Sequence, residues 1–405
     1  MMYLAYQTQA DLMEPVRFGA RLARKMLNTP FMAAFGTAGI RHMSAAYEMV
    51  ERAGLSHGRP PFGIPSVAVG NRELEVTEEP VYRLPFGTLL HFKKDADVPQ
   101  PRVLVVAPMS GHFATLLAGT VRTLLPDHDV FITDWHNARD VSLEHGPFAF
   151  DDYVEHIIKF LEWMGPGAHL LAVCQPCVQA LAASAVMAQE GNVAQPRSMT
   201  LMAGPIDCRI NPTKVNELAQ SKPIEWFERN LISKVPMGFA GSGRRVYPGF
   251  IQLSAFVSMN LGRHMKAHFE LYENLANGDA EKAEAAKSFY DEYFAVLDLA
   301  AEFYLETVQY VFQEYRLPKG ELTYRGNKLD FTAIRRTSLL TVEGERDDIC
   351  SLGQTLAAQD ICSNLRPHRK RHHMQPGVGH YGVFSGRKWA NQVYPLVRNH
   401  ILASD

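Results

Sequence analysis

Three residues of this sequence have the side chains of a catalytic triad, in the order nucleophile, acid and histidine: Cys174, Asp347 and His380. Each lies just after a predicted strand, and parallel strands present their carboxyl ends at one edge of a sheet. A thiol, a carboxylate and an imidazole that meet there can attack a carbonyl group. His380 would move the proton and Asp347 would fix the imidazole tautomer. His372 and His373 are alternatives for the histidine.

The nucleophile is predicted from the segment around Cys174. His169–Val173 is an apolar run typical of a buried strand, and the Ala-rich segment 175–188 favours a helix that has Pro176 in its first turn. Cys174 lies at the sharp junction, with the small Ala172 two positions before it, where a helix N-terminus favours a thiolate. We therefore expect Cys174 to be the nucleophile.

Two other interpretations of this segment remain open. A cysteine after a buried strand is often only a small core residue. Cys174 and Cys177 also form a C-x-x-C pair at a strand–helix junction, which is the pattern of thioredoxin-like redox sites. The redox interpretation is weaker because the pair lies in the middle of a much larger α/β pattern.

The same geometry predicts an oxyanion hole. One donor should be the backbone N–H of Gln175, directly after the nucleophile. The other should come from the loop after the strand at residues 102–107, at Met109 or Ser110. The alternative is that Pro108–His112 is a plain strand-to-helix turn.

The elements that must position these residues alternate between strands and helices. This alternation predicts a mostly parallel sheet with helices on both faces, and the order of the triad makes it the α/β-hydrolase fold. Residues 66–94 alternate apolar and polar side chains and predict antiparallel strands at a sheet edge. The predicted central strands are 102–107, 130–133, 169–173, 198–203, 338–342 and 370–374.

The chain is predicted to have three parts. Residues 1–65 form an N-terminal helical extension, 66–206 and 326–405 form the hydrolase core, and 207–325 form a helical, aromatic-rich cap. The first helix has apolar residues at helical intervals, which predicts a face packed on the domain. The alternative is a surface that touches a hydrophobic particle. These residues are Tyr3, Tyr6, Leu12, Val16, Phe18, Leu22 and Met26.

Composition limits the class of protein. The 405 residues are 46% hydrophobic and 21% charged with a net charge of −2, which predicts a globular protein and gives no sign of a nucleic-acid partner. Five scattered cysteines favour a reducing compartment. No signal peptide and no membrane span is evident, so we expect a cytoplasmic protein. No ligand cluster has metal spacing and we expect no cofactor. A homo-oligomer is compatible with the sequence.

Several sequence blocks together resemble the intracellular polyhydroxybutyrate (PHB) depolymerases, over nearly the whole chain. The blocks are Ala-Val-Cys174-Gln-Pro, Ala-Pro-Met-Ser-Gly-His112, Thr-Asp-Trp135, Gly-Pro-Ile-Asp207, Gly-Arg-Arg-Val-Tyr-Pro-Gly-Phe250, Thr-Val-Glu-Gly-Glu-Arg-Asp347-Asp348 and Gly-His380-Tyr-Gly. The resemblance implies a Cys-Asp-His triad, which falls on Cys174, Asp347 and His380, and ranks Cys177 below Cys174. It also implies amorphous polyester of intracellular storage granules as substrate.

The sequence thus predicts a cysteine-dependent esterase that hydrolyses poly(3-hydroxybutyrate) to oligomers and monomer at the granule surface. Two alternatives remain. One is a polyhydroxyalkanoate synthase-like or coenzyme A-dependent acyltransferase, although the related synthases have Gly-x-Cys-x-Gly-Gly and this chain has Ala172 and Pro176 around Cys174. The other is a granule-binding protein without catalytic activity.

Overall fold

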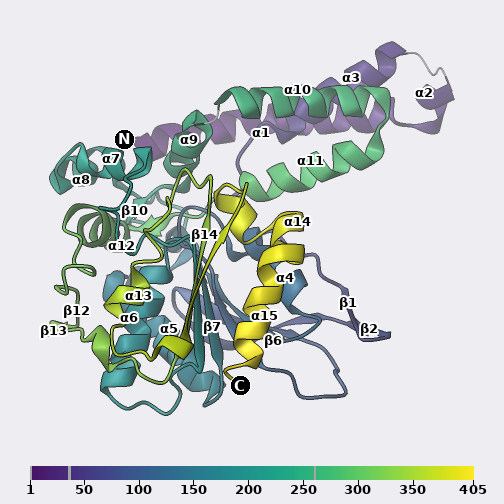
Figure 1. Ribbon diagram of the computed structural model, residues 1–405. Helices are drawn as coiled ribbons and strands as arrows, with labels where there is room; N and C mark the ends of the chain where they lie inside the picture. The colour runs from purple at the N-terminus through teal and green to yellow at the C-terminus, as the bar shows by residue number, and fades with distance from the viewer. Residues whose placement is uncertain (1, 35–37, 260) are drawn as a thin grey trace.

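An eight-stranded β-sheet forms the centre of the computed structural model, which describes residues 2–34, 38–259 and 261–405 (Figure 1). The strand order is β15-β14-β8-β7-β5-β6-β4-β3, and every neighbouring pair is parallel except the two pairs that include β4. This topology is that of the α/β-hydrolase fold, so the predicted fold is confirmed. The strands are β3 Thr77–Leu84, β4 Gly87–Lys93, β5 Arg102–Val106, β6 Asp129–Trp135, β7 His169–Val173, β8 Ser198–Met202, β14 Ser338–Gly344 and β15 Lys370–Gln375.

Helices cover both faces of this sheet. Figure 1 shows α5 and α6 on one face and α4 and α15 on the other. All residues of β7 and β8 are buried, which explains why their sequences are apolar runs rather than alternating patterns. These four helices are α4 Ala118–Leu124, α5 Phe150–Met164, α6 Cys177–Gln189 and α15 Tyr394–Leu402.

The strands within residues 66–94 pair in antiparallel fashion, as predicted. β3 and β4 pair at the edge of the large sheet. β1 (Ser66–Val69) and β2 (Arg72–Glu75) instead form a separate hairpin.

The chain leaves the sheet between β8 and β14 and returns to it after more than a hundred residues. This segment is mostly helical, as expected, but it also contains a small antiparallel sheet of β9 Ser233–Lys234, β10 Arg245–Tyr247 and β11 Leu299–Ala300. Strands of two or three residues carry no periodicity that a sequence pattern can detect. The helices are α7 Lys214–Gln220, α8 Ile224–Leu231, α9 Gly249–Met259, α10 Leu261–Asn277, α11 Ala280–Tyr293 and α12 Ala301–Thr307.

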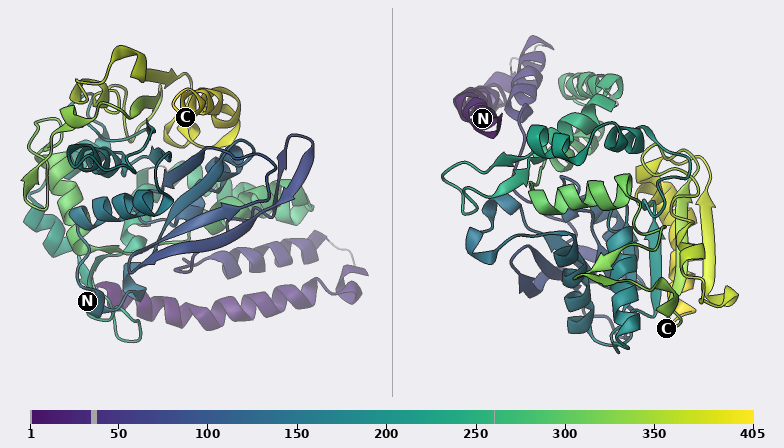
Figure 2. Two further views of the ribbon diagram at one scale, coloured as in Figure 1. Left: turned by 90° about the horizontal axis from the view of Figure 1, so that it is seen from below. Right: turned by 90° about the vertical axis from the view of Figure 1, so that its left-hand side faces the viewer.

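Four long helices form an arm that extends beyond the sheet. They are α1 Met2–Leu27, α3 Ala38–Arg52, α10 and α11, and the short α2 (Pro30–Ala34) lies at the far end (Figures 1 and 2). α3 packs against both α1 and α10. The N-terminal segment and the segment between β8 and β14 therefore share this arm. No helix in the described ranges is long and apolar enough to cross a membrane.

The apolar face of α1 is turned outward beyond its first turns, so the prediction that this face packs on the domain holds for Tyr3 and Tyr6 and is wrong for the rest. At about 100° per residue, six of its large apolar residues lie within an arc of about 160°, and their side chains are between 47% and 70% exposed. Arginines occupy the opposite face, where Arg21 pairs with Glu51 at 2.9 Å and Arg24 with Glu48 at 3.1 Å on α3. Ion pairs hold α1 on α3 and leave this apolar stripe to solvent. The stripe consists of Leu4, Leu12, Val16, Phe18, Leu22 and Met26.

Only the start of α1 is anchored by buried contacts. The Tyr3 hydroxyl donates to Oδ2 of Asp298 at 2.6 Å, while Oδ1 of Asp298 accepts from the backbone N–H of Gly249 at 2.8 Å. Tyr6 stacks on Phe250 with ring centroids 3.9 Å apart. Burial raises the pKa of Asp298. The chain start is thus fixed to the segment between β8 and β14.

Candidate active site

Cys174 lies on a strained turn between β7 and α6. Its φ is +67°, in the left-handed region that residues with a side chain rarely adopt. Its N–H donates to Met202 O on β8 at 2.8 Å, and its carbonyl accepts from the N–H of Cys177 at 3.1 Å. These bonds keep the strained conformation in place, and strain of this kind is characteristic of functional positions. Helix α6 begins at Cys177, two residues later than predicted, because Pro176 forms its N-cap.

Cys177 is buried behind this turn. Its thiol faces the carbonyl oxygens of Ala172 at 3.4 Å and Met202 at 3.6 Å, and burial raises its pKa well above the ordinary value. Gly204 packs directly on it, since a Cβ at Gly204 would lie 2.4 Å from the Cys177 sulfur. A protonated, enclosed thiol is a poor nucleophile. Cys174 by contrast is half-buried and lines a cavity.

Asp347 and His380 are bonded to each other. Oδ2 of Asp347 accepts from Nδ1 of His380 at 2.8 Å, and the other oxygen accepts from the backbone N–H groups of Ile349 at 2.9 Å and Cys350 at 2.8 Å. Both side chains are buried. The carboxylate is therefore fixed on both oxygens, and its bond to Nδ1 leaves Nε2 of the imidazole for another partner.

His380 also faces Cys174. Burial alone lowers the pKa of His380, but Cys174 and Asp347 outweigh it, and the pKa is raised well above the ordinary value. The structure thus brings together Cys174, Asp347 and His380, three residues on different loops at the carboxyl edge of the sheet. It does not place the two alternative histidines there. His372 bonds to Thr341, and His373 bonds to Gln375.

One glycine lets the histidine loop approach the end of β14, and a second lets the histidine loop fold tightly on itself. A Cβ at Gly344, the last residue of β14, would lie 3.0 Å from Val378 O. A Cβ at Gly382 would lie 2.7 Å from Cβ of Val378. A side chain at Gly344 would push the His380 loop away from β14, and a side chain at Gly382 would clash with Val378 within the His380 loop itself.

The loop after β5 carries the residues predicted for the second oxyanion donor. The N–H of Met109 donates to Oε1 of Gln175 at 3.4 Å, so this donor points toward the residue after Cys174. Ser110 and Met109 both line the cavity that contains Cys174. The loop is fastened to the segment between β8 and β14, because Leu297 N–H donates to Gly111 O at 2.8 Å and His112 bonds to Tyr293 O at 3.2 Å.

Some residues that position the site were not identified from the sequence. The carbonyl of Ala107, at the end of β5, accepts from the Trp135 indole at 2.8 Å and from the Tyr153 hydroxyl at 2.7 Å. Glu343 is buried and its carboxylate accepts from three backbone N–H groups of residues 353–356, which shapes the loop after Asp347. Trp135 and Glu343 both lie in the sequence blocks that resemble the depolymerase family. Membership of these blocks was the signal from which the two residues could have been found.

An apolar cavity of about 210 Å³ opens beside Cys174. Its floor is formed by Met109, Ser110, Cys174 and Gln175, and its walls come from the segment between β8 and β14. The aromatic residues of these walls are Phe227, Tyr247, Phe256, Phe303, Tyr304 and Phe312. Aromatic side chains of that segment therefore lie over the thiol.

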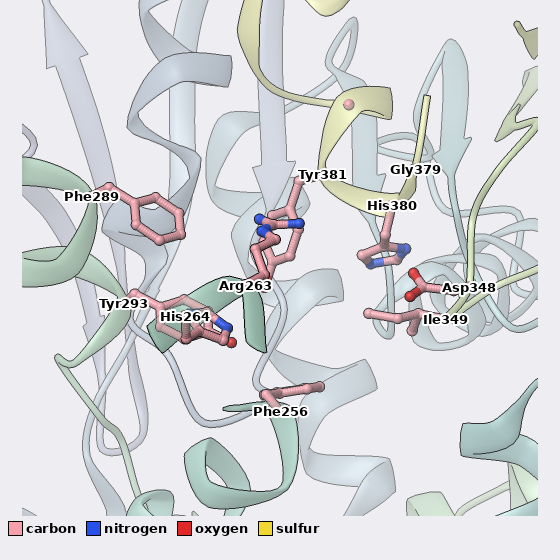
Figure 3. Close-up of a pocket in the computed structure, with 11 residues that line it drawn as sticks. Phe256, Arg263, His264, Phe289, Tyr293, Asp348, Ile349, Gly379, His380 and Tyr381 are labelled. Atoms are coloured by element: carbon pink, nitrogen blue, oxygen red, sulfur yellow. The ribbon is translucent and has the colours of Figure 1, made fainter. Parts of the chain in front are cut away.

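A second cavity, of about 250 Å³, lies on the histidine side (Figure 3). His380 and Tyr381 line it from the sheet side, and Arg263 and Phe289 line it from the arm. Phe256 and Ile349 line both cavities and so separate them. Arg263 and Ile349 had no signal in the sequence, whereas Phe256 is one of the aromatic residues of the predicted cap. Within the described ranges, no group of three or more His, Cys, Asp or Glu residues is arranged to hold a metal ion.

Comparison with known proteins identifies a family for half of the chain. Residues 203–405 match the family model described as PHB de-polymerase C-terminus. None of the curated proteins compared with the chain matches it.

Three solved structures that match the chain are distant from it in sequence. The epoxide hydrolase of Bacillus megaterium is 11% identical, with 83% of this chain and 99% of that chain covered and a TM-score of 0.46. A hydrolase of Rhodococcus sp. strain RHA1, which acts on 2-hydroxy-6-oxo-6-phenylhexa-2,4-dienoate, is 12% identical over 81% and 99% of the chains, with a TM-score of 0.41. A thermophilic esterase of Thermogutta terrifontis is 13% identical over 83% and 97%, with a TM-score of 0.40.

Proposed function

This chain belongs to the family defined by the PHB de-polymerase C-terminus, and on that premise we propose that it hydrolyses poly(3-hydroxybutyrate) through a Cys174-Asp347-His380 triad. The observation that carries the proposal is the pairing of His380 with Asp347 at 2.8 Å while the same imidazole faces Cys174. Family membership supports ester hydrolysis, and this geometry supports the cysteine as nucleophile.

In the first half of the reaction, His380 holds the proton of the Cys174 thiol, and the sulfur attacks the ester carbonyl carbon. The carbonyl oxygen becomes an oxyanion, stabilised by the N–H of Gln175 and by an N–H of Met109 or Ser110. When the oxyanion collapses, the carbon–oxygen bond of the ester breaks. His380 gives its proton to the leaving alkoxide oxygen, and the acyl part remains on Cys174 as a thioester.

In the second half, water replaces the alcohol. His380 takes a proton from the water as its oxygen attacks the thioester carbon, and Asp347 stabilises the imidazolium that forms. The carbon–sulfur bond then breaks, the acid product leaves, and the proton returns to the sulfur. The net reaction consumes one water for each ester bond and uses only side chains and backbone donors of this chain.

The two cavities on either side of the triad suit the two halves of the ester. The acyl part would lie in the apolar cavity, because that cavity includes Cys174, Gln175 and the β5 loop. The leaving alcohol would lie in the cavity lined by His380, which protonates it. The aromatic walls favour a substrate that is itself apolar.

The apolar stripe of α1 is proposed as the surface that binds the storage granule. Exposed apolar patches of this kind mark interaction sites, and the substrate of this family is an apolar solid. The stripe is held outward by ion pairs on the opposite side of α1, including Arg21–Glu51 and Arg24–Glu48. A cytoplasmic location, with the enzyme attached to granules through α1, belongs to the same proposal.

The test measures the release of hydroxybutyrate products from amorphous polyester granules by the wild type, Cys174→Ala and Cys177→Ala. Loss of a nucleophile lowers turnover by a factor on the order of a million in serine hydrolases, so Cys174→Ala should be inactive. Cys177→Ala, the matched control, should retain most of the activity because its thiol faces backbone carbonyls.

The opposite outcome, an inactive Cys177→Ala, would refute the nucleophile assignment. If the wild type bound granules but released no hydroxybutyrate products, hydrolysis would be refuted altogether. Product release that depends on added coenzyme A would instead identify an acyltransferase.

A further inference from the structure

Arg263 has a guanidinium group that bonds to none of the residues described in the structure, and it lies at the cavity on the leaving-group side. It belongs to the first turn of α10, and Figure 3 shows its guanidinium beside the ring of Tyr381, in the same cavity as His380. Among the residues that the structure describes, no carboxylate lies within salt-bridge distance of Arg263. The aromatic side chains of Phe289, Tyr293 and Tyr381 surround it in the cavity lining.

A guanidinium in this place fits one feature of a polyester. Arginine is always charged and presents N–H donors in a planar fork that matches a carboxylate. The interior of a poly(hydroxybutyrate) chain carries no charge. Only its carboxyl end is an anion, and that end always belongs to the alcohol side of the ester bond being cleaved.

We propose that Arg263 binds the terminal carboxylate of the polyester chain in the cavity beside His380, so that the enzyme removes short units from the carboxyl end. This inference rests on the proposed function, since it assigns the leaving group to the His380 side. The acyl part, which extends toward the hydroxyl end, would occupy the apolar cavity beside Cys174.

The other charged and titratable groups of the cavity are compatible with this assignment. Asp348 also lines it, but Figure 3 places that carboxylate on the other side of His380 from Arg263. His264 is buried on α10, and burial lowers its pKa, so it adds no positive charge at neutral pH. Apart from the catalytic His380, whose pKa is raised, Arg263 is therefore the cation among the described residues that line this cavity.

The released fragment has a way out past Arg263. A third cavity, of about 560 Å³, shares Arg263, Phe289 and Tyr381 with the cavity beside His380 and continues beyond them. A short hydroxy acid freed by cleavage can leave on that side while the acyl part stays bound to Cys174.

The experiment compares a hydroxybutyrate oligomer of defined length, blocked at its hydroxyl end, as the free acid and as the methyl ester. The two differ only in the charge at the carboxyl end. The wild type should show a KM for the free acid about tenfold or more below that for the methyl ester, because a charge-assisted hydrogen bond to arginine has this size. Products should be short carboxyl-terminal fragments.

Arg263→Gln should raise the KM for the free acid to that of the methyl ester and leave kcat for both unchanged. Lys266→Gln is the matched control, because it removes a positive charge from an exposed position on the same helix, outside the cavity. It should preserve the preference for the free acid.

Equal kcat/KM for both oligomers with the wild type, or cleavage at random internal bonds, would overturn the inference and leave the proposed function intact. Cleavage of neither oligomer would refute the proposed function itself.

Discussion

The backbone N–H of Met109 donates its hydrogen bond to the side-chain oxygen of Gln175, at 3.4 Å. The donor comes from the loop after β5 and the acceptor from the residue after Cys174, so the bond closes the space between the two expected oxyanion donors. A substrate oxyanion at Met109 must displace the Gln175 oxygen. This side chain therefore controls the site where negative charge develops.

A negative charge at position 175 should weaken stabilisation of the oxyanion and so lower kcat. Gln175→Glu places a second anion beside the developing oxyanion, and we expect kcat for a short neutral ester to fall by a factor on the order of a hundred. Gln175→Ala removes the side chain and keeps the backbone donor, so its kcat should stay within about tenfold of the wild type. Equal activity of the Glu and Ala variants would place the oxyanion away from Met109.

Asp347, and not Asp348, should orient His380. Asp347 is buried and bonded to Nδ1 of the imidazole, while Asp348 is exposed and lines the neighbouring cavity. Asp347→Asn should favour the wrong tautomer and lower kcat roughly ten-thousand-fold. Kinetics with a short neutral ester would check this, with Asp348→Asn as the comparison. Turnover near that of the wild type in Asp347→Asn would contradict the assignment.

The apolar stripe of α1 should be needed for granules but not for soluble esters. Replacing Leu12, Phe18 and Leu22 by serine removes large apolar groups from the exposed face, so binding to amorphous granules in a sedimentation assay should weaken strongly. Hydrolysis of a short soluble ester should continue at the wild-type rate. Glu14→Ser, also on α1, is a control that leaves the stripe unchanged. Unaltered sedimentation of the triple variant would exclude the stripe as the binding surface.

The rate of hydrolysis should depend on whether the polymer is amorphous or crystalline. The thiol lies beneath aromatic side chains such as Phe256, Tyr304 and Phe312, so a chain segment must leave the particle to reach Cys174. A segment fixed in a crystal loses packing contacts along its length when it is withdrawn. We expect product release from amorphous granules and little from an equal mass of crystalline polymer. Equal rates on the two forms would show that the aromatic cover does not limit access.

His112 should make stability depend on acid pH. Burial lowers its pKa to about 4, whereas the unfolded chain has an ordinary histidine pKa of about 6.5. The unfolded state then binds more protons between these values, so this contribution to stability is present above pH 6.5 and lost as pH falls toward 4.

Denaturant unfolding of His112→Gln at two pH values tests this. The destabilisation caused by the substitution should be about 2 kcal/mol smaller at pH 5 than at pH 7. A constant effect of His112→Gln would mean that folding does not lower the pKa of His112.

The sheet and the order of the site residues were predictable because buried parallel strands leave a clear signal. His169–Val173, for example, is a run of buried apolar residues in the structure with the same bounds as in the sequence. The association of Asp347 with His380 followed from their places after β14 and β15. The division at residues 65, 206 and 325 stays a prediction.

Features that depend on tertiary packing were not predictable. The amphipathic pattern of α1 predicts which residues share a face, but it cannot tell that Arg21 and Arg24 find carboxylates on α3 and turn the apolar face outward. Arg263 is an ordinary basic residue of an exposed helix in the sequence. It becomes noticeable only because α10 brings it to the same cavity as His380, more than a hundred residues later.

The bond between Tyr3 and Asp298 also constrains how the protein is made. The two residues are separated by 295 positions, and at about 5–20 residues per second their synthesis is about 15–60 s apart. During that interval α1 has left the ribosome, but the acceptor for its tyrosine does not yet exist. The start of the first helix therefore reaches its final contacts only after most of the chain has been made, although the rest of α1 can pair with α3 as soon as α3 has been synthesised.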